Sequence, residues 1–442
     1  MRRREFLKRA LAGLALTPGL GCNPGSRRKK PNIVLIMADD IGYECFGCYG
    51  SGQYRTPNLD ELARTGIRFT HCYSQPLCTP SRVQIMTGRY NFRNYKAFGY
   101  LDPAEITFAN VLKEAGYSTF IAGKWQLNGI KQYPGWQDAG RPGHFGFDEH
   151  CLWQLTHGRA DGERYADPLI ERDGELLTGL EDRYGPDLFC EAILDFIERN
   201  AAGPFFVYYP MALTHCPFWP TPDTPEWSDP AGRRPGDGYR GEKRYFPDMV
   251  RYLDKIIGRI VSRLNSLGLR DDTLVLFTSD NGTDRPIESK LGDRIIKGGK
   301  SEMTDAGTHV PLIANWGRSG ATGTVCDDPV DFSDFLPTLA EAAAAALPGD
   351  RTIDGQSFLP QLRGQKGNPR EWIFCHYWGR GRIEEQAREY VRDKRYKLYD
   401  NGAFYDLQSD PLEESPLQRP GSEAEQVRRR LQQAMASVKS GA

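Results

Sequence analysis

The chain has 442 residues, which is enough for one large domain and a smaller one, or for two domains. A formal net charge of -1 gives no electrostatic reason to expect a nucleic-acid partner, and 39% hydrophobic residues are ordinary for a globular protein. After the N-terminus, no apolar run is long enough to span a bilayer.

Residues 1–30 predict a targeting segment rather than part of the fold. Arg3 and Arg4, followed by the apolar residues 10–20, resemble a bacterial twin-arginine (Tat) signal, which exports folded proteins. The residues before Cys22 form an imperfect lipoprotein cleavage site, so a lipid anchor at Cys22 is the one membrane attachment suggested. A disordered basic tail is the alternative. We therefore expect a periplasmic or cell-surface protein.

The first predicted strand is the apolar run at residues 33–38, which is typical of a strand buried on both faces of a parallel sheet. It ends at Asp39 and Asp40, on the sheet edge where open α/β folds bind ligands. Two neighbouring carboxylates in a low dielectric repel each other, so a cation is their natural partner. An acidic turn or helix cap is the alternative.

Cys78 stands just before a predicted helix, and Arg82 follows one turn later. We expect Thr79 to be the N-cap, Pro80 to occupy the first helical position and Gly88 to end the helix. Cys78 would then lie at a helix N-terminus, where free N–H groups favour an anion. A half-buried structural cysteine is the alternative. The other cysteines are scattered and do not suggest a disulfide framework.

Polar groups also follow later predicted strands, which lie at residues 118–122, 204–209 and 274–278. The groups that follow these strands are Lys124, His215, Asp280 and Asn281. Lys300, in a Gly-Gly-Lys segment, is added to them. Each alone is an ordinary loop residue, but the carboxyl ends of parallel strands meet at one edge of a sheet. We therefore expect these side chains to gather there.

Strands alternate with predicted helices, which lie at residues 107–115, 187–200, 249–267 and 332–346. This alternation predicts an α/β catalytic domain at residues 31–368, with a mostly parallel central sheet flanked by helices. Residues 132–187 are irregular and predict loops over the sheet edge. Short aromatic strands and a charged helix predict a smaller α+β subdomain with an antiparallel sheet at residues 369–442.

Together, these residues resemble the formylglycine-dependent sulfatase family of the alkaline-phosphatase-like superfamily. Cys78-Thr79-Pro80-Ser81-Arg82, with Thr87-Gly88-Arg89, matches the family signature C-x-P-S-R…T-G-R. The strand-end residues described above match the other family motifs, and the resemblance covers roughly residues 31 to 417.

The resemblance implies a sulfuric ester hydrolase. A separate formylglycine-generating enzyme would oxidise Cys78 to an aldehyde, which hydrates to a gem-diol. One hydroxyl would attack sulfur and expel the alcohol, leaving a covalent sulfate ester that the second hydroxyl then eliminates. One Ca²⁺ would be bound by residue 78 and by four oxygen donors, which are Asp39, Asp40, Asp280 and Asn281.

The family also implies roles for the remaining residues. Lys124 and Lys300 would bind sulfate oxygens, and His215 would protonate the leaving alcohol. Arg82 would hold the diol and the metal carboxylates. Gln126 departs from the family pattern, because a histidine that helps to deprotonate the second hydroxyl usually stands there and a glutamine cannot act as a base. Either another group serves or sulfate release is slow.

Three other functions stay open. A phosphatase with a free thiolate usually needs an arginine six positions after its cysteine, where this chain has Gln84. A phosphodiester or phosphonate hydrolase could use the same fold, since sulfate and phosphate esters are similar oxyanions. A glycan-binding pseudoenzyme would account for Gln126.

Export toward the cell surface favours a sulfated carbohydrate substrate over a small aryl sulfate. Aromatic and basic residues that could line an outer sugar pocket are Trp153, His157, Arg159, Trp219, Trp227, His376, Trp378 and Arg380. Ordinary loop packing is the alternative for each of them.

Overall fold

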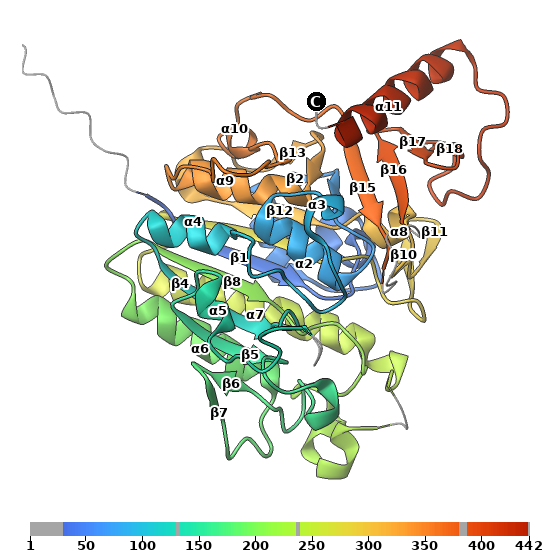
Figure 1. Ribbon diagram of the computed structural model, residues 1–442. Coiled ribbons are helices and arrows are strands. Elements are labelled where there is room, and N and C mark those ends of the chain that lie inside the picture. The colour runs from blue at the N-terminus through green and yellow to red at the C-terminus, as the bar shows by residue number, and fades with distance from the viewer. Residues whose placement is uncertain (1–29, 130–132, 236–238, 380–386, 441–442) are drawn as a thin grey trace, which may run out of the picture. The chain divides into compact units, whose positions relative to one another are not determined.

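The computed structural model of the protein describes residues 30–129, 133–235, 239–379 and 387–440 (Figure 1). From Pro31 onward the chain forms one compact unit. The predicted Tat signal and Cys22 lie outside the described residues, so export and the lipid anchor stay predictions. Within the described ranges, no helix has the length and apolarity needed to cross a membrane.

A ten-stranded sheet forms the centre of this unit, in the order β13-β2-β12-β9-β1-β8-β4-β5-β6-β7. The five middle strands are parallel to one another, and antiparallel pairs flank them on both sides. The middle strands are β9 (Thr273–Ser279), β1 (Asn32–Ala38), β8 (Phe205–Pro210), β4 (Ser118–Lys124) and β5 (Glu149–Trp153). The outer strands are β13 (Thr324–Cys326), β2 (Ile67–Phe69), β12 (Leu312–Asn315), β6 (Glu171–Arg172) and β7 (Glu175–Leu176). The predicted mostly parallel α/β fold is confirmed.

Helices cover both faces of the sheet (Figure 1). Alternate residues of β1 point to opposite faces, because side chains alternate along a strand. Val34 and Ile36 belong to one core cluster, with α1 (Pro57–Arg64), α6 (Gly185–Arg199) and α7 (Phe246–Ser266). Ile33 and Leu35 belong to the other, with α2 (Cys78–Thr87), α4 (Phe108–Glu114) and α9 (Phe335–Ala342). Both faces of β1 are therefore covered, which explains its unbroken apolar sequence.

The parallel register brings the strand ends together. Ala38 of β1 pairs with Ser279 of β9, and Met37 pairs with Pro210 of β8. Lys124 is the last residue of β4 and lies opposite Trp153 of β5. The segments that follow these strands therefore start from one edge of the sheet, as the sequence predicts.

The prediction of loops alone at residues 132–187 is wrong. This stretch contains α5 (Arg141–His144) and β5, which extends the parallel part of the sheet beyond β4. Its sequence, Glu-His-Cys-Leu-Trp, has too few consecutive apolar residues to look like a buried strand, yet four of the five residues are buried. Packing between β4 and the segments beyond it therefore determines this strand more than its own propensity does.

Smaller elements complete the unit. They are β3 (Cys72–Tyr73), paired with β14 (Val330–Asp331), the hairpin β10 (Glu288–Leu291) and β11 (Arg294–Lys297), and the short helices α3 (Asn91–Asn94), α8 (Asp305–Thr308) and α10 (Leu359–Leu362). No disulfide joins the cysteines of the described ranges.

The C-terminal part contains the predicted antiparallel sheet. Its strands are β15 (Ile373–Tyr377), β16 (Arg388–Arg392), β17 (Tyr396–Tyr399) and β18 (Phe404–Asp406), and α11 (Ser422–Ser440) packs on β16 and β17. Arg392 and Lys397 form buried ion pairs with Asp305 at 2.6 and 3.3 Å, so this sheet is tied directly to α8. A domain boundary at residue 368 stays a prediction.

Gly123, next to Lys124 in β4, provides a test of how the strand positions the site. Its φ of +116° disfavours any other residue, and a Cβ there would lie 2.1 Å from the carbonyl oxygen of Pro210 in β8. Gly123→Ala should lower the free energy of unfolding by about 2 to 4 kcal/mol, because backbone strain and overpacking add. Urea denaturation measures this change.

Gly116→Ala is the matched control, because Gly116 has a φ of +85° but a Cβ there would meet no atom of the described residues within 4 Å. It should cost only about 1 to 2 kcal/mol, from the backbone alone. Equal losses in the two variants would contradict the close contact between β4 and β8.

Candidate active site

Helix α2 places Cys78 at the strand ends. The helix begins at Cys78, so the prediction that Thr79 is the N-cap and Pro80 the first helical residue is wrong by two positions. Leu77, with extended backbone, occupies the cap position, and the Thr79 hydroxyl instead accepts a hydrogen bond from the Gly99 N–H at 3.0 Å. Cys78 still lies at the helix N-terminus, as predicted.

All ten residues of α2 are buried, which is unusual for a helix that carries polar side chains. Gln84 shows how the polarity is satisfied, since its amide donates to Asp331 at 2.6 Å and accepts from Gln75 at 2.6 Å. Gly88 ends the helix with a φ of +68°, as predicted for a glycine at that position. The helix is therefore packed along its whole length, and this packing also holds residue 78 in place.

Arg82 links α2 to three strand ends. One guanidinium nitrogen donates to the carbonyl oxygen of Lys124 at 2.7 Å. Another donates to Asp280 at 3.3 Å and lies 3.6 Å from Asp39. A buried arginine needs such acceptors, and here they orient the carboxylates that surround it.

Asp39, Asp40, Asp280 and Asn281 form one buried group of oxygen donors. The backbone N–H of Asp40 donates to Asp280 at 3.1 Å, and the amide of Asn281 donates to Asp40 at 2.9 Å. One side-chain oxygen of Asp39 and that of Asn281 are buried with no hydrogen-bond partner among the described residues. Free oxygen atoms in such a buried group fit a hard divalent cation such as Ca²⁺.

The pKa values of these carboxyl groups also favour a bound cation. Burial, together with the negative charge of Asp39, raises the pKa of Asp280 to about 8. Burial also raises the pKa of Asp40, although Lys300 opposes it. For Asp39 the burial effect is outweighed by Lys124 and Arg82, so its pKa is lowered. A bound cation would favour the ionised form of all three groups.

Two lysines and a histidine stand beside the carboxylates. Lys124 donates to Asp39 at 2.7 Å, and Lys300 forms a short ion pair with Asp40. Lys300 also donates to Nε2 of His215 at 3.1 Å, and Nδ1 of His215 donates to the carbonyl oxygen of Cys216 at 2.6 Å. Burial, with Lys300 and Lys124, lowers the pKa of His215 well below its usual value. The lowered pKa favours the neutral form of His215, as does the hydrogen bond that Nε2 accepts from Lys300, so an acid role would require an anionic substrate nearby.

Cys78 and Gln126 face each other within the same site. The Cys78 thiol donates to the side-chain oxygen of Gln126 at 4.0 Å. Cys78 is 2% exposed, and burial raises the pKa of its thiol despite the nearby charge of Lys124. The protein therefore does not stabilise a thiolate at this position.

A cavity of about 420 Å³ opens onto this site. Five predicted site residues line it, namely Cys78, Lys124, Gln126, His215 and Lys300. Trp153 and Arg159, from the proposed outer pocket, line it too. Five other candidates for the outer sugar pocket are described but do not line this cavity, namely His157, Trp219, Trp227, His376 and Trp378. Arg380 lies outside the described ranges.

Five residues that the sequence does not single out also line the cavity, namely Leu77, Phe98, Gln154, Arg164 and Tyr239. Gln154 follows β5, the strand that the sequence pattern does not predict. Arg164 belongs to residues 132–187, for which the sequence predicts loops, and no periodicity or motif there distinguishes one arginine from another.

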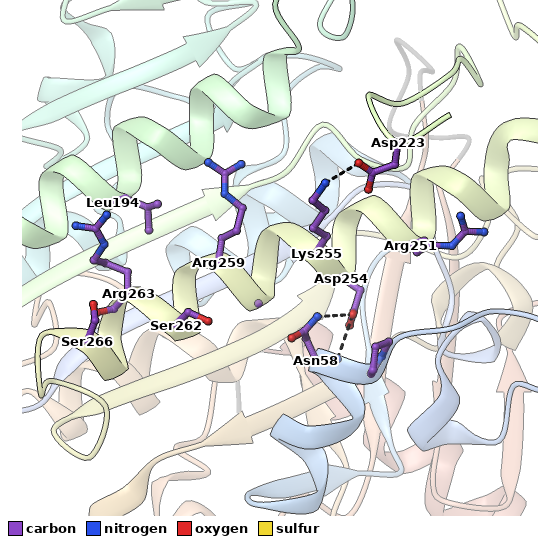
Figure 2. A pocket seen from close by; sticks show the side chains of 12 residues that line it. Asn58, Leu194, Asp223, Arg251, Asp254, Lys255, Arg259, Ser262, Arg263 and Ser266 are labelled. Carbon is purple, nitrogen blue, oxygen red and sulfur yellow. Dashed lines mark hydrogen bonds and ion pairs between the residues drawn. The ribbon is translucent and has the colours of Figure 1, made fainter. Parts of the chain in front are cut away.

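Figure 2 shows another hollow, of about 820 Å³, that runs along α7. It carries four basic residues at helical spacing, namely Arg251, Lys255, Arg259 and Arg263. Each forms an ion pair with an acidic side chain, and these partners are Asp248, Asp223, Asp187 and Glu198. These basic side chains are therefore already ion-paired within the protein.

Known proteins share both the sequence pattern and the fold. The Sulfatase family model matches residues 31–345, and the model for the C-terminal part of N-sulphoglucosamine sulphohydrolase matches residues 299–441. Human arylsulfatase A is 33% identical over 437 residues, covering 90% of this chain and 80% of that protein.

Two solved structures have the same fold. One is described as a complex with its substrate D-glucosamine-2-N,6-O-disulfate, and it has a TM-score of 0.72 at 22% identity, covering 93% of this chain and 98% of that one. The other is a phosphonate monoester hydrolase of Agrobacterium radiobacter, with a TM-score of 0.69 at 21% identity, covering 93% of this chain and 96% of that one.

The family model spans well over half of the chain, and the relative is similar over most of its own length. The chain therefore belongs to the sulfatase family and is a sulfuric ester hydrolase.

Proposed function

We propose that this sulfatase removes sulfate from a sulfated carbohydrate through a formylglycine hydrate at position 78 and a covalent sulfo-enzyme intermediate. The observation that carries the proposal is that Cys78, Lys124 and Lys300 line one cavity, while the buried carboxylates of Asp39 and Asp40 lie against the two lysines. Cleavage of a sulfate ester needs a nucleophile, groups that neutralise the sulfate charge and a proton donor. This site has a candidate residue for each of these roles.

The side chains of the chain itself would act as follows. Lys124 and Lys300 bind the sulfate oxygens and stabilise the charge that they gain in the transition state. His215 gives its proton to the leaving alcohol after the substrate's negative charge has raised its pKa. Arg82 keeps the carboxylates and the residue at 78 in register through its bonds to the ends of β4 and β9.

The four oxygen donors and residue 78 would hold one Ca²⁺. Carboxylate and amide oxygens are its preferred ligands, and one oxygen each of Asp39 and Asn281 is buried without a partner among the described residues. When bound, the ion would lower the pKa of a hydroxyl at position 78 and offset the charge of the sulfate. Maturation of Cys78 would require a formylglycine-generating enzyme as a transient partner.

A carbohydrate is the substrate class that the cavity favours. Tyr239 lines the cavity and is 43% exposed, and Arg159 stacks on it at 3.8 Å, so an aromatic ring and a basic group are both available to a sugar. A structure with the same fold has a sulfated glucosamine as its substrate, but at 22% identity this likeness speaks for the fold alone. A small aryl sulfate is the alternative, in line with the similarity to arylsulfatase A.

Two rival reactions have weaker support. A phosphonate hydrolase shares the fold, but at 21% identity this likeness speaks for the fold alone. A thiolate phosphatase is disfavoured for two reasons. Burial raises the pKa of the Cys78 thiol, and Arg82 pairs with Asp280, so it is not available to bind a phosphate.

The proposal predicts a clear preference for sulfate esters. Protein produced with a formylglycine-generating enzyme should hydrolyse a sulfated sugar with a kcat/KM at least about tenfold above that for the matched phosphodiester or phosphonate ester, which corresponds to about 1.4 kcal/mol in the transition state. Steady-state kinetics on each pair of esters provides the measurement.

Cys78→Ala is the control for this experiment and should lower kcat by about a thousandfold or more, as loss of a covalent nucleophile does. Chelation should abolish activity, and Ca²⁺ should restore it. A preference for phosphodiesters would overturn the proposed function, and activity confined to aryl sulfates would overturn the carbohydrate substrate.

Gln126 makes a second prediction. If it leaves the second hydroxyl without a base, release of enzyme-bound sulfate limits turnover, and the wild-type protein shows a burst of alcohol followed by a slow phase. Gln126→His should speed the slow phase roughly 10- to 100-fold, since a positioned base contributes about that much or more. Stopped-flow assays with a chromogenic sulfate ester resolve the two phases.

Gln126→Ala serves as the comparison, because it removes the contact with residue 78 without adding a base. It should leave the slow phase unaccelerated. An unchanged slow phase in Gln126→His would mean that another residue already supplies the base.

A further inference from the structure

Arg164 is a buried cation at the catalytic cavity, and its donors are unused within the described part of the chain. It is 1% exposed, yet none of its three guanidinium nitrogens has an acceptor among the described residues. A carboxylate oxygen of Glu163 lies 3.7 Å away, beyond hydrogen-bond distance. Burying an arginine in this way is costly, so we expect a group from outside the chain to supply the missing acceptors.

The surroundings of Arg164 hold it ready for such a group. Its guanidinium carbon lies 4.0 Å from the centre of the Trp153 ring, so the aromatic face supports the planar fork. Trp153 itself is fixed, because its ring N–H donates to the carbonyl oxygen of Gly162 at 3.1 Å. Both residues line the cavity that contains Cys78.

Arg164 differs in this respect from the other cations of the site. Lys124, Lys300 and Arg82 each contact one of the carboxylates at the strand ends. Arg159, near Arg164 in the chain, is paired with Glu163 at 3.2 Å. Among the described residues that line this cavity, Arg164 is the buried basic residue with no acceptor for any of its donors. It therefore differs from the lysines that would bind the sulfate to be cleaved.

We propose that Arg164 binds a second anionic group of the substrate, so that the enzyme prefers sulfated sugars that carry a further carboxylate or sulfate. This inference rests on the proposed function and names its substrate class more closely. A guanidinium fork matches the two oxygens of a carboxylate or of a sulfate in a bidentate pair, and the chemistry is shared by both groups. The separate substrates below distinguish them.

The test uses the matured full-length protein and three matched disaccharides, each with one cleavable sulfate. The first carries a uronic acid carboxylate, the second its methyl ester and the third a second sulfate in place of the carboxylate. The wild-type kcat/KM should be roughly 10- to 100-fold higher for one or both of the charged sugars than for the methyl ester, as charged hydrogen bonds allow. The favoured sugar identifies the anion.

Arg164→Gln should bring this ratio to near one, and Arg164→Lys should keep part of it because the charge remains without the planar fork. The control is Arg263→Gln on α7, which removes an ion-paired arginine of the other hollow and should leave the ratio unchanged (Figure 2). The melting temperature of Arg164→Gln should change little, since Arg164 makes no hydrogen bond to the described residues and the carboxylate of Glu163 keeps its ion pair with Arg159.

Three results would overturn the inference. They are equal kcat/KM values for charged and neutral sugars in the wild type, an equal loss on all three sugars in Arg164→Gln, and a lowered melting temperature with an unchanged ratio. The first result would show that the enzyme recognises no second anion. The second would show that Arg164 contacts the cleaved sulfate, and the third would show that Arg164 has a structural role. A wild-type enzyme that hydrolyses none of the sulfate esters overturns the proposed function itself, which is a different outcome from hydrolysis without preference.

Discussion

The structure depends on a buried balance of charge at the carboxyl ends of the parallel strands. Asp39, Asp40 and Asp280 are fully buried, and Arg82, Lys124 and Lys300 lie against them. Removing one partner would leave an uncompensated charge in a low dielectric, which usually costs several kcal/mol. The backbone register of β1, β4 and β9 therefore has to be correct to a single residue, because a slip would separate these buried charges.

Much of this arrangement follows from the sequence. Long apolar runs that stop at charged residues predict buried parallel strands whose ends meet, and the Cys-Thr-Pro-Ser-Arg segment identifies the helix that faces them. Position relative to a strand end is thus enough to group Asp39, Lys124, His215 and Asp280. The pattern works because both faces of the middle strands are covered by helices, which leaves only the edge for polar groups.

The remaining part depends on contacts that a sequence pattern does not record. β5 is buried by its neighbours rather than by its own apolar content, so the sequence alone does not place Trp153 and Gln154 at the edge. Leu77 occupies the cap position of α2 without a side-chain hydrogen bond, and the Thr79 hydroxyl accepts from Gly99 instead of capping the helix. Arg164 looks like any loop arginine until its unused donors are seen in three dimensions.

The central claim is that residue 78 works as an aldehyde hydrate and not as a thiol, and its chemical state can be measured directly. Mass spectrometry of the peptide that carries residue 78, from protein matured with a formylglycine-generating enzyme, should show loss of sulfur and the mass of formylglycine or its hydrate. An active enzyme whose peptide retains an unmodified cysteine would contradict the account.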